Sequence, residues 1–214
     1  NSKDLKNLFD FYRGKGFEPC LITPSILTMD EVTEIKDFIK ELSVKKVIVN
    51  NFALMDLDCD IVVGSSLNVA NTYAVDFYKS KGIKEFIPSR EMTIGEIDGA
   101  FNDTILRLPY YTNTVSMITK TIGTDVIDEL NREKNVKIED AKNERFPVKT
   151  VRGKYYIYNS KPLFMARSID KIDVDIIEIT YDENYSQILD YFYGNINDVN
   201  FNYTTGHYNR GVAR

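Results

Sequence analysis

Short, continuous runs of apolar residues alternate with amphipathic helical segments along the first half of the chain. The apolar runs lie at residues 19–23, 46–49, 60–63, 85–88 and 104–108. The helical segments lie at residues 5–12, 28–42 and 68–81, with a short fourth one beginning at Thr93. Strands without polar alternation are typical of parallel sheets buried on both faces. The pattern therefore predicts an α/β fold.

Two of the predicted helices begin with a capping box. Thr28 precedes Glu31, and Thr93 precedes Glu96, each pair at the spacing in which hydroxyl and carboxylate satisfy each other's backbone N–H groups. These pairs fix where the helices start.

The choice lies between a doubly wound sheet and a TIM-like (β/α) barrel. No Gly-rich phosphate fingerprint follows a predicted strand, and consecutive units are similar in size, which favours the barrel. About six strands are predicted where a barrel needs eight, and the chain starts on a helix. We therefore expect a barrel that is incomplete at the N-terminus, with missing strands supplied by a longer chain or a partner. Open edges of this kind would favour homo-oligomers.

The second half of the chain has a different pattern. Residues 122–142 are polar and helix-prone, residues 145–158 indicate a β-hairpin insertion turning at Gly153, and residues 175–180 indicate a last strand. A helix is expected at 185–193 and an irregular tail from residue 195. We predict one domain over residues 1–214, with β/α units in 1–120, the helix-prone segment and hairpin in 121–165, and the last strand, helix and tail in 166–214.

The net charge, the length of the apolar runs and the cysteine content limit which partners and cofactors we expect. The 214-residue chain has a net charge of −5, a pI near 5.1 and no apolar run approaching the ~20 residues that span a bilayer. We expect a soluble, cytoplasmic protein without membrane contact, and the acidity does not favour RNA as a partner. Cys20 and Cys59 are isolated and form no metal-ligand spacing, so we expect neither a metal nor another cofactor.

Several separated segments resemble peptidase family U32, the collagenase-like proteases. They are S-L-N-V-A-N-T-Y-A at 66–74 with P-S-R-E-M-T at 88–93, R-F-P-V at 145–148, I-Y-N-S-K-P-L at 157–163 and T-G-H-Y-N-R-G at 205–211. The resemblance covers about residues 60–214. It implies a barrel and a peptidase acting on a peptide or protein substrate.

The chain departs from the family pattern at residues 110–120. Family members commonly carry a cysteine there and more beyond it, and the members that help hydroxylate RNA bases or quinone precursors look as if they depend on a four-cysteine [4Fe–4S] cluster. Cluster iron is held by thiolates, so a chain with two cysteines outside this segment cannot build such a cluster alone.

Polar residues that follow the strands of a β/α barrel line its mouth, where active sites form. The candidates at that position are Asn68, Asn71, Ser89, Arg90 and Glu91. Glu91 could act as a general base or anchor a basic substrate; alternatively it forms a salt bridge with Arg90 or Arg107. Asn68 could cap the helix that follows, or its loop could bind an anion. Asn71 could bond in the mouth or to the adjacent loop.

His207, the only histidine, is the natural acid/base candidate, either folded over the mouth or on the surface. Arg107, Arg145 and Asn159 are further candidates for substrate binding, with structural roles as the alternative. No metalloprotease or serine-hydrolase motif is present. Two functions remain open: a U32-type peptidase with a polar site at the barrel mouth, and a non-catalytic barrel that binds a partner protein or RNA in a modification pathway.

Overall fold

The chain divides into two units, each assembled from separated segments. The computed structural model describes residues 2–132 and 136–210. Unit 1 comprises the described residues of 2–108, 168–176 and 207–210, and unit 2 those of 109–167 and 177–206. The chain therefore passes between the units four times.

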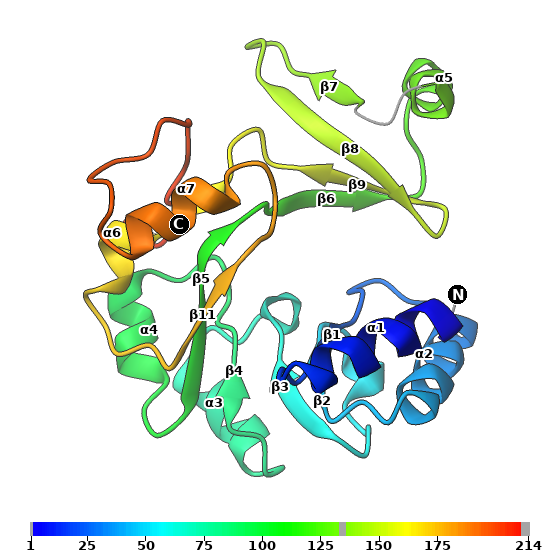
Figure 1. The fold of residues 1–214 in the computed structure, drawn as a ribbon, viewed down its shortest axis with the longest axis vertical. Coiled ribbons are helices and arrows are strands. Elements are labelled where there is room, and N and C mark those ends of the chain that lie inside the picture. The colour runs from blue at the N-terminus through cyan, green and yellow to red at the C-terminus, as the bar shows by residue number, and fades with distance from the viewer. Residues whose placement is uncertain (1, 133–135, 211–214) are drawn as a thin grey trace. The chain divides into compact units, whose positions relative to one another are not determined.

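Unit 1 is built on parallel strands joined by helices (Figure 1). Its strands pair in the order β1-β2-β3-β4-β5, each parallel to the next. The strands are β1 Cys20–Ile22, β2 Lys46–Val49, β3 Asp60–Val63, β4 Glu85–Phe86 and the first part of β5 Ile105–Thr112. The helices are α1 Ser2–Gly14, α2 Met29–Glu41, α3 Thr72–Lys79 and α4 Ile94–Ala100, with the 3-10 turns η1 Phe52–Leu54 and η2 Ser65–Leu67.

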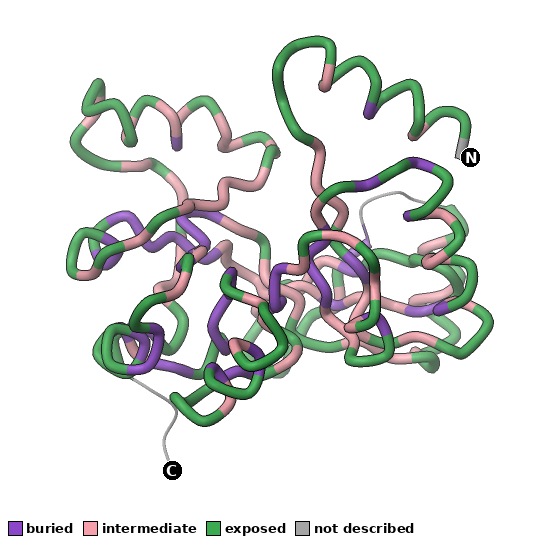
Figure 2. The backbone as a smooth tube through the Cα atoms, turned by 90° about the horizontal axis from the view of Figure 1, so that it is seen from below, coloured by how far each residue is buried: buried purple, intermediate pink, exposed green. Residues whose placement is uncertain are grey.

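Strand β2 is buried on both faces, as its unbroken apolar sequence predicts. Val47 and Val49 pack with residues of α1 and α2, whereas Ile48 packs on the other face with Val62 and Ile87. Figure 2 shows that α1, the helix at the N-terminus, is mostly exposed. Only Phe9 of α1 is buried among its described side chains, whereas Leu8, Phe11 and Tyr12 are exposed.

Strand β5 belongs to both units and changes partners along its length. Ile105 and Leu106 pair with parallel β4, and Tyr111 and Thr112 pair with antiparallel β10 (Leu163–Phe164). Pro109, which has no N–H to donate, lies between these two paired stretches. β11 (Ile176–Ile179) also pairs with β5. α6 (Ala166–Ile169) and α7 (Tyr185–Phe192) lie close to these strands in sequence.

Unit 2 also contains a four-stranded antiparallel sheet in the order β6-β9-β8-β7. Its strands are β6 Val115–Thr119, β7 Lys137–Glu139, β8 Arg145–Val151 and β9 Lys154–Tyr158, and helix α5 is Thr124–Arg132. Arg152 and Gly153 turn the β8–β9 hairpin with positive φ angles of 50° and 69°. Two successive positive φ angles suit the twist of a two-residue hairpin, and glycine adopts them at little cost.

The prediction of a TIM-like barrel with a hairpin insertion is wrong. The parallel β/α pattern stops at β5, and the sheet becomes mixed where antiparallel β10 joins it. The predicted hairpin is half of a separate four-stranded sheet. The physical reason is that β5 is joined to β6, and β8 to β9, by two residues each, whereas a parallel pair needs a crossover connection of a dozen or more residues.

Several predictions of individual helices and strands are confirmed. Both capping boxes are present, and the strands at 46–49 and 60–63 have the predicted bounds. The helix predicted at 68–81 is shorter, and the helix-prone segment 122–142 contains α5 followed by strand β7. Residues 133–135 of that segment and residue 211 of the last family motif lie outside the described residues. Within the described ranges, no helix has the length and apolarity to cross a bilayer.

Candidate functional site

The C-terminal ends of the parallel strands in unit 1 carry linked polar groups. Thr23 follows β1 and Asn50 follows β2. The Asn50 backbone N–H donates to the Thr23 hydroxyl at 2.9 Å, and its side-chain amide donates to the Thr23 carbonyl at 3.0 Å. Ligands of open α/β sheets bind at this edge. We call this region the C-terminal edge.

Asn50 also connects β2 to the loop after β3. Its amide oxygen accepts the Ser66 N–H at 3.3 Å, and Gly64 donates its N–H to the Val49 carbonyl at 2.8 Å. A Cβ at Gly64 would lie 2.8 Å from that carbonyl oxygen and closer still to the Asn50 amide oxygen. Glycine is therefore required at this position by close approach.

Asn68 and Ser89, both predicted site residues, meet at the same edge. Asn68 has a left-handed φ of 53° at the end of η2, and its amide oxygen accepts the Ser89 hydroxyl at 2.6 Å. Ser89 is 2% exposed, and its hydroxyl also accepts the Glu91 N–H at 3.3 Å. The two side chains thus hold the loop after β4 against the loop after β3.

The predicted capping role belongs to the neighbouring asparagine. Asn71, not Asn68, is the N-cap of α3, and its amide oxygen accepts the Ala74 N–H at 2.9 Å. The side-chain oxygen of Asn71 is therefore bonded to its own helix and not to another residue of the predicted mouth. Asparagine at an N-cap satisfies one of the orphan N–H groups of the first turn.

Glu91 and Arg90 are exposed beside Ser89. Among the described residues, the Glu91 carboxylate has no hydrogen-bond or ion-pair partner. Arg107 is paired elsewhere, with Glu85, so it is not the salt-bridge partner of Glu91. Glu91 therefore offers an uncommitted carboxylate next to a fixed loop.

The tail that carries His207 is held against the segment that follows Glu91. The Ile94 N–H donates to the Tyr208 carbonyl at 2.8 Å, and Tyr208 is 2% exposed. The Ser168 hydroxyl donates to the Asn209 amide oxygen at 3.1 Å, which ties the tail to α6. His207 itself is exposed. Glu91 and His207 thus lie on two chain segments that contact each other within unit 1.

The opposite edge of the sheet holds a charged group that sequence reasoning missed. Glu85, whose side chain is 7% exposed, accepts Lys46 Nζ at 2.6 Å on one oxygen and Arg107 Nε at 3.0 Å on the other, with a second contact from Arg107 Nη2. Burial opposes ionisation of Glu85, but the hydrogen bonds and charges of Lys46 and Arg107 outweigh it and lower its pKa. The sequence feature that could have indicated this group is a charged residue at the first position of two otherwise apolar strands, Lys46 in β2 and Glu85 in β4.

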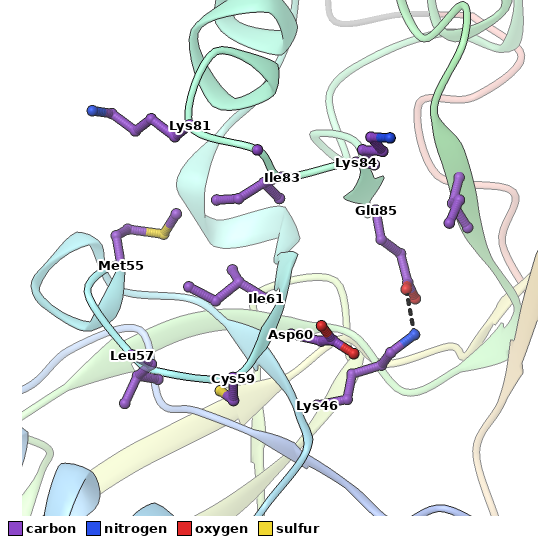
Figure 3. Close-up of a pocket in the computed structure, with 12 residues that line it drawn as sticks. Lys46, Met55, Leu57, Cys59, Asp60, Ile61, Lys81, Ile83, Lys84 and Glu85 are labelled. Carbon is purple, nitrogen blue, oxygen red and sulfur yellow. Dashed lines mark hydrogen bonds and ion pairs between the residues drawn. The ribbon is translucent and has the colours of Figure 1, made fainter.

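A cavity of about 450 Å³ opens beside this group, and Figure 3 shows the Lys46–Glu85 contact at its wall. Asp60 also lines it, and Met55 and Ile61 supply apolar surface. The cavity lies at the N-terminal ends of the strands, which in β/α folds serve stability and not catalysis. Because Glu85 is neutralised by its own partners, we assign this group to the scaffold. Arg107 is thereby separated from the C-terminal edge.

The last two candidate residues belong to unit 2. Arg145 is exposed and donates from Nε to Glu139 on the neighbouring strand at 3.0 Å. The Asn159 amide oxygen accepts the Ser160 N–H at 3.0 Å, and Asn159 lines a cavity of that unit. The remaining seven candidates lie in unit 1.

The described residues contain no group of three or more His, Cys, Asp and Glu side chains placed to hold a metal ion. Cys20 and Cys59 are half-buried free thiols, and burial raises the pKa of each. A raised pKa keeps a thiol protonated and unreactive. The Ser89 hydroxyl donates to an amide oxygen, which cannot take up its proton. Among the described residues of this edge, Glu91 is thus an exposed carboxylate, and His207 lies on the tail that contacts the segment after it.

A family model described as Peptidase family U32 matches residues 1–110 of the 214. No curated protein and no solved structure matches the chain. The match covers the parallel strands of unit 1, including the whole C-terminal edge.

Proposed function

Since the chain belongs to peptidase family U32, we propose that it hydrolyses peptide bonds at the C-terminal edge of β1–β4. The observation that carries this proposal is the exposed Glu91 carboxylate, which has no partner among the described residues and follows the Asn68–Ser89 hydrogen bond. A carboxylate so placed can act as a general base.

The proposed reaction needs a base and an acid on the two segments that meet here. Glu91 takes a proton from water as the water oxygen attacks the peptide carbonyl carbon. His207 gives a proton to the departing amine nitrogen as the C–N bond breaks. The Ile94–Tyr208 hydrogen bond supports this pairing, because it holds the tail beside the start of α4.

Arg90 is the proposed substrate-binding residue of the edge, because its exposed guanidinium neighbours Glu91 in the chain. A guanidinium binds carbonyl and carboxylate oxygens with a fixed fork of donors. Asn68 and Ser89 would act by positioning the loop, since their side chains are bonded to each other.

A second candidate function is non-catalytic binding of a partner protein, including a second copy of this chain. The Ser89 hydroxyl donates to an amide oxygen and not to a base, so the described residues of the edge do not form a serine nucleophile with its general base. This observation favours the binding function. In this case Glu91 would anchor a cationic group of the partner. RNA is the weaker choice, because the chain has a net charge of −5.

Digestion of gelatin and casein by purified protein tests the proposal. Glu91→Ala should abolish cleavage and leave the free energy of unfolding within about 0.5 kcal/mol of wild type, because the side chain is exposed. His207→Ala should slow cleavage roughly 100-fold or more. Asp98→Ala, an exposed carboxylate on α4, is the matched control and should retain activity.

Cleavage that survives in Glu91→Ala would refute the assigned role of Glu91. If wild type cleaves neither protein, the peptidase proposal fails. A pull-down with Glu91→Ala as the comparison would then test the binding function.

A further inference from the structure

Unit 2 contains a cavity of its own, about 430 Å³ in volume. This size falls within the range of roughly 300–1,000 Å³ that is usual for small-molecule sites. One wall comes from the end of β5 and the loop between β11 and α7, and the other from strands β7, β8 and β9. We call it the unit-2 pocket. It shares no residue with the C-terminal edge.

A pre-positioned carboxylate lies on the first wall. Asp182 accepts the Tyr111 hydroxyl at 2.8 Å and the Asn113 amide at 2.7 Å on one oxygen, and the Asn184 backbone N–H at 2.9 Å on the other. A carboxylate has about four acceptor positions, so these bonds fix the group and leave capacity for one more donor. Glu183, the next residue, also lines the pocket and is exposed.

Tyr111 makes this arrangement rigid. Its side chain is fully buried, and its hydroxyl accepts the Asn184 side-chain amide at 2.8 Å while donating to Asp182. Burial raises the pKa of Tyr111 strongly, and the charges of Asp182 and Glu183 raise it further. The tyrosine therefore remains a neutral donor, and this wall attracts positive charge.

The second wall carries the opposite charge. Lys149 and Lys137 line it, and the Lys149 ammonium lies 5.3 Å from the centre of the Tyr158 ring. A cation over an aromatic face is held in place without neutralising its charge. The pocket thus presents carboxylates on one side and ammonium groups on the other.

We propose that the unit-2 pocket binds a small zwitterion, an amino acid or dipeptide. Its ammonium group would donate to Asp182 and face Glu183, and its carboxylate would face Lys149 and Lys137. A bare metal cation fits less well, because the described residues offer no group of three metal-binding side chains. The inference goes beyond the peptidase proposal and does not depend on it.

Calorimetric titration with glycylglycine tests the site, because the ligand can be stripped of one charge at a time. N-acetylglycylglycine lacks the ammonium and should bind roughly tenfold or more weaker, the usual effect of losing a hydrogen bond between charged groups. Glycylglycine amide lacks the carboxylate and should also bind more weakly. Glycine, which has no peptide bond to hydrolyse, should also bind, which separates this test from that of the peptidase.

Substitutions locate the binding within unit 2. Asp182→Asn should weaken binding roughly tenfold or more. Glu183→Gln changes an exposed side chain outside the Tyr111 network, so it should fold normally and weaken binding several-fold. Asp190→Asn, on α7 outside the pocket, is the matched control and should bind like wild type.

Absence of binding heat at millimolar glycylglycine would overturn the proposal. Equal binding of the N-acetyl derivative would do the same, whether or not Asp182→Asn folds. Binding that is unchanged in Glu183→Gln and in Lys149→Gln would place the ligand outside this pocket.

Discussion

Glu85 shows how one residue can hold three strands of a parallel sheet. Its carboxylate, on β4, accepts bonds from Lys46 on β2 and Arg107 on β5. The side chain of Arg107 is 14% exposed and that of Lys46 is 32% exposed, so the group is shielded from solvent mainly on the β5 side. Removing the carboxylate would leave two neighbouring cations without a counter-charge, which is more costly than the loss of the pair itself.

We expect Glu85→Gln to lower the free energy of unfolding by about 3 kcal/mol, near the lower end for breaking a buried ion pair because Lys46 is partly solvated. Urea denaturation at pH 7 measures this. The control is Glu139→Gln, which breaks the exposed pair with Arg145 and should cost at most about 0.5 kcal/mol. Equal losses in both variants would contradict the assignment of Glu85 to the scaffold.

The lowered pKa of Glu85 makes this contribution depend on pH. A carboxyl group whose pKa is lower in the folded state stabilises the fold fully above its unfolded pKa of about 4.3. The contribution is lost as pH falls through the folded pKa. The stability difference between wild type and Glu85→Gln should therefore be constant from about pH 6 to 7 and should shrink below about pH 4. A difference that grows on acidification would refute the direction of the shift.

A substitution at Gly64 tests whether the loop after β3 is held close to Asn50 at the C-terminal edge. Gly64→Ala would place a Cβ against Val49 and Asn50, so we expect a loss of about 1–3 kcal/mol from overpacking. Gly95→Ala, in open space on α4, is the matched control and should be stabilising by up to about 1 kcal/mol. Thermal unfolding of both variants gives the comparison. A neutral Gly64→Ala would mean that the loop after β3 can move away from Asn50.

At the scale of elements, helix starts were the most predictable feature of the fold. The Thr28–Glu31 and Thr93–Glu96 boxes are local, so the sequence contains all of their partners within four residues. We expect Thr28→Ala to cost about 1 kcal/mol by thermal unfolding, because an orphan N–H loses its acceptor. Thr33→Ala, on the exposed surface of the same helix, should be neutral or slightly stabilising. Equal losses would show that the box contributes nothing.

Strand existence was predictable where the apolar run was continuous, as in β2 and β3. Strand partners were not. β5 was predicted as another parallel strand, yet its second part pairs with β10, about 50 residues later in the chain. Hydrophobic periodicity indicates which faces are buried, but it does not indicate whether the next partner runs parallel or antiparallel.

The same limit applies to the candidate sites. Asn68 and Ser89 were predicted to lie at one edge because they follow neighbouring strands, and they bond to each other. Lys46 and Glu85 are 39 residues apart and Tyr111 and Asp182 are 71 apart, so neither pairing has a local signature. Charged and aromatic partners brought together by tertiary structure were therefore missed.

At the scale of the whole molecule, the cysteine content sets a limit on redox chemistry. The chain has two cysteines, and a [4Fe–4S] cluster uses four thiolates. After anaerobic reconstitution with iron and sulfide, we expect wild type to show no more cluster absorbance than the Cys20→Ser/Cys59→Ser double variant. A cluster spectrum in wild type alone would show that subunits combine their thiols around one cluster.

The discontinuous make-up of unit 1 has a consequence for synthesis on the ribosome. Tyr208 is buried in unit 1, yet it is translated after all of unit 2. About 100 residues separate Leu108 from His207, which at 5–20 residues per second takes roughly 5–20 s. During that interval the nascent parallel strands lack the segment that accepts the Ile94 N–H. The start of α4 then lacks this contact, and the last step of unit 1 folding waits until residues 207–210 have been synthesised.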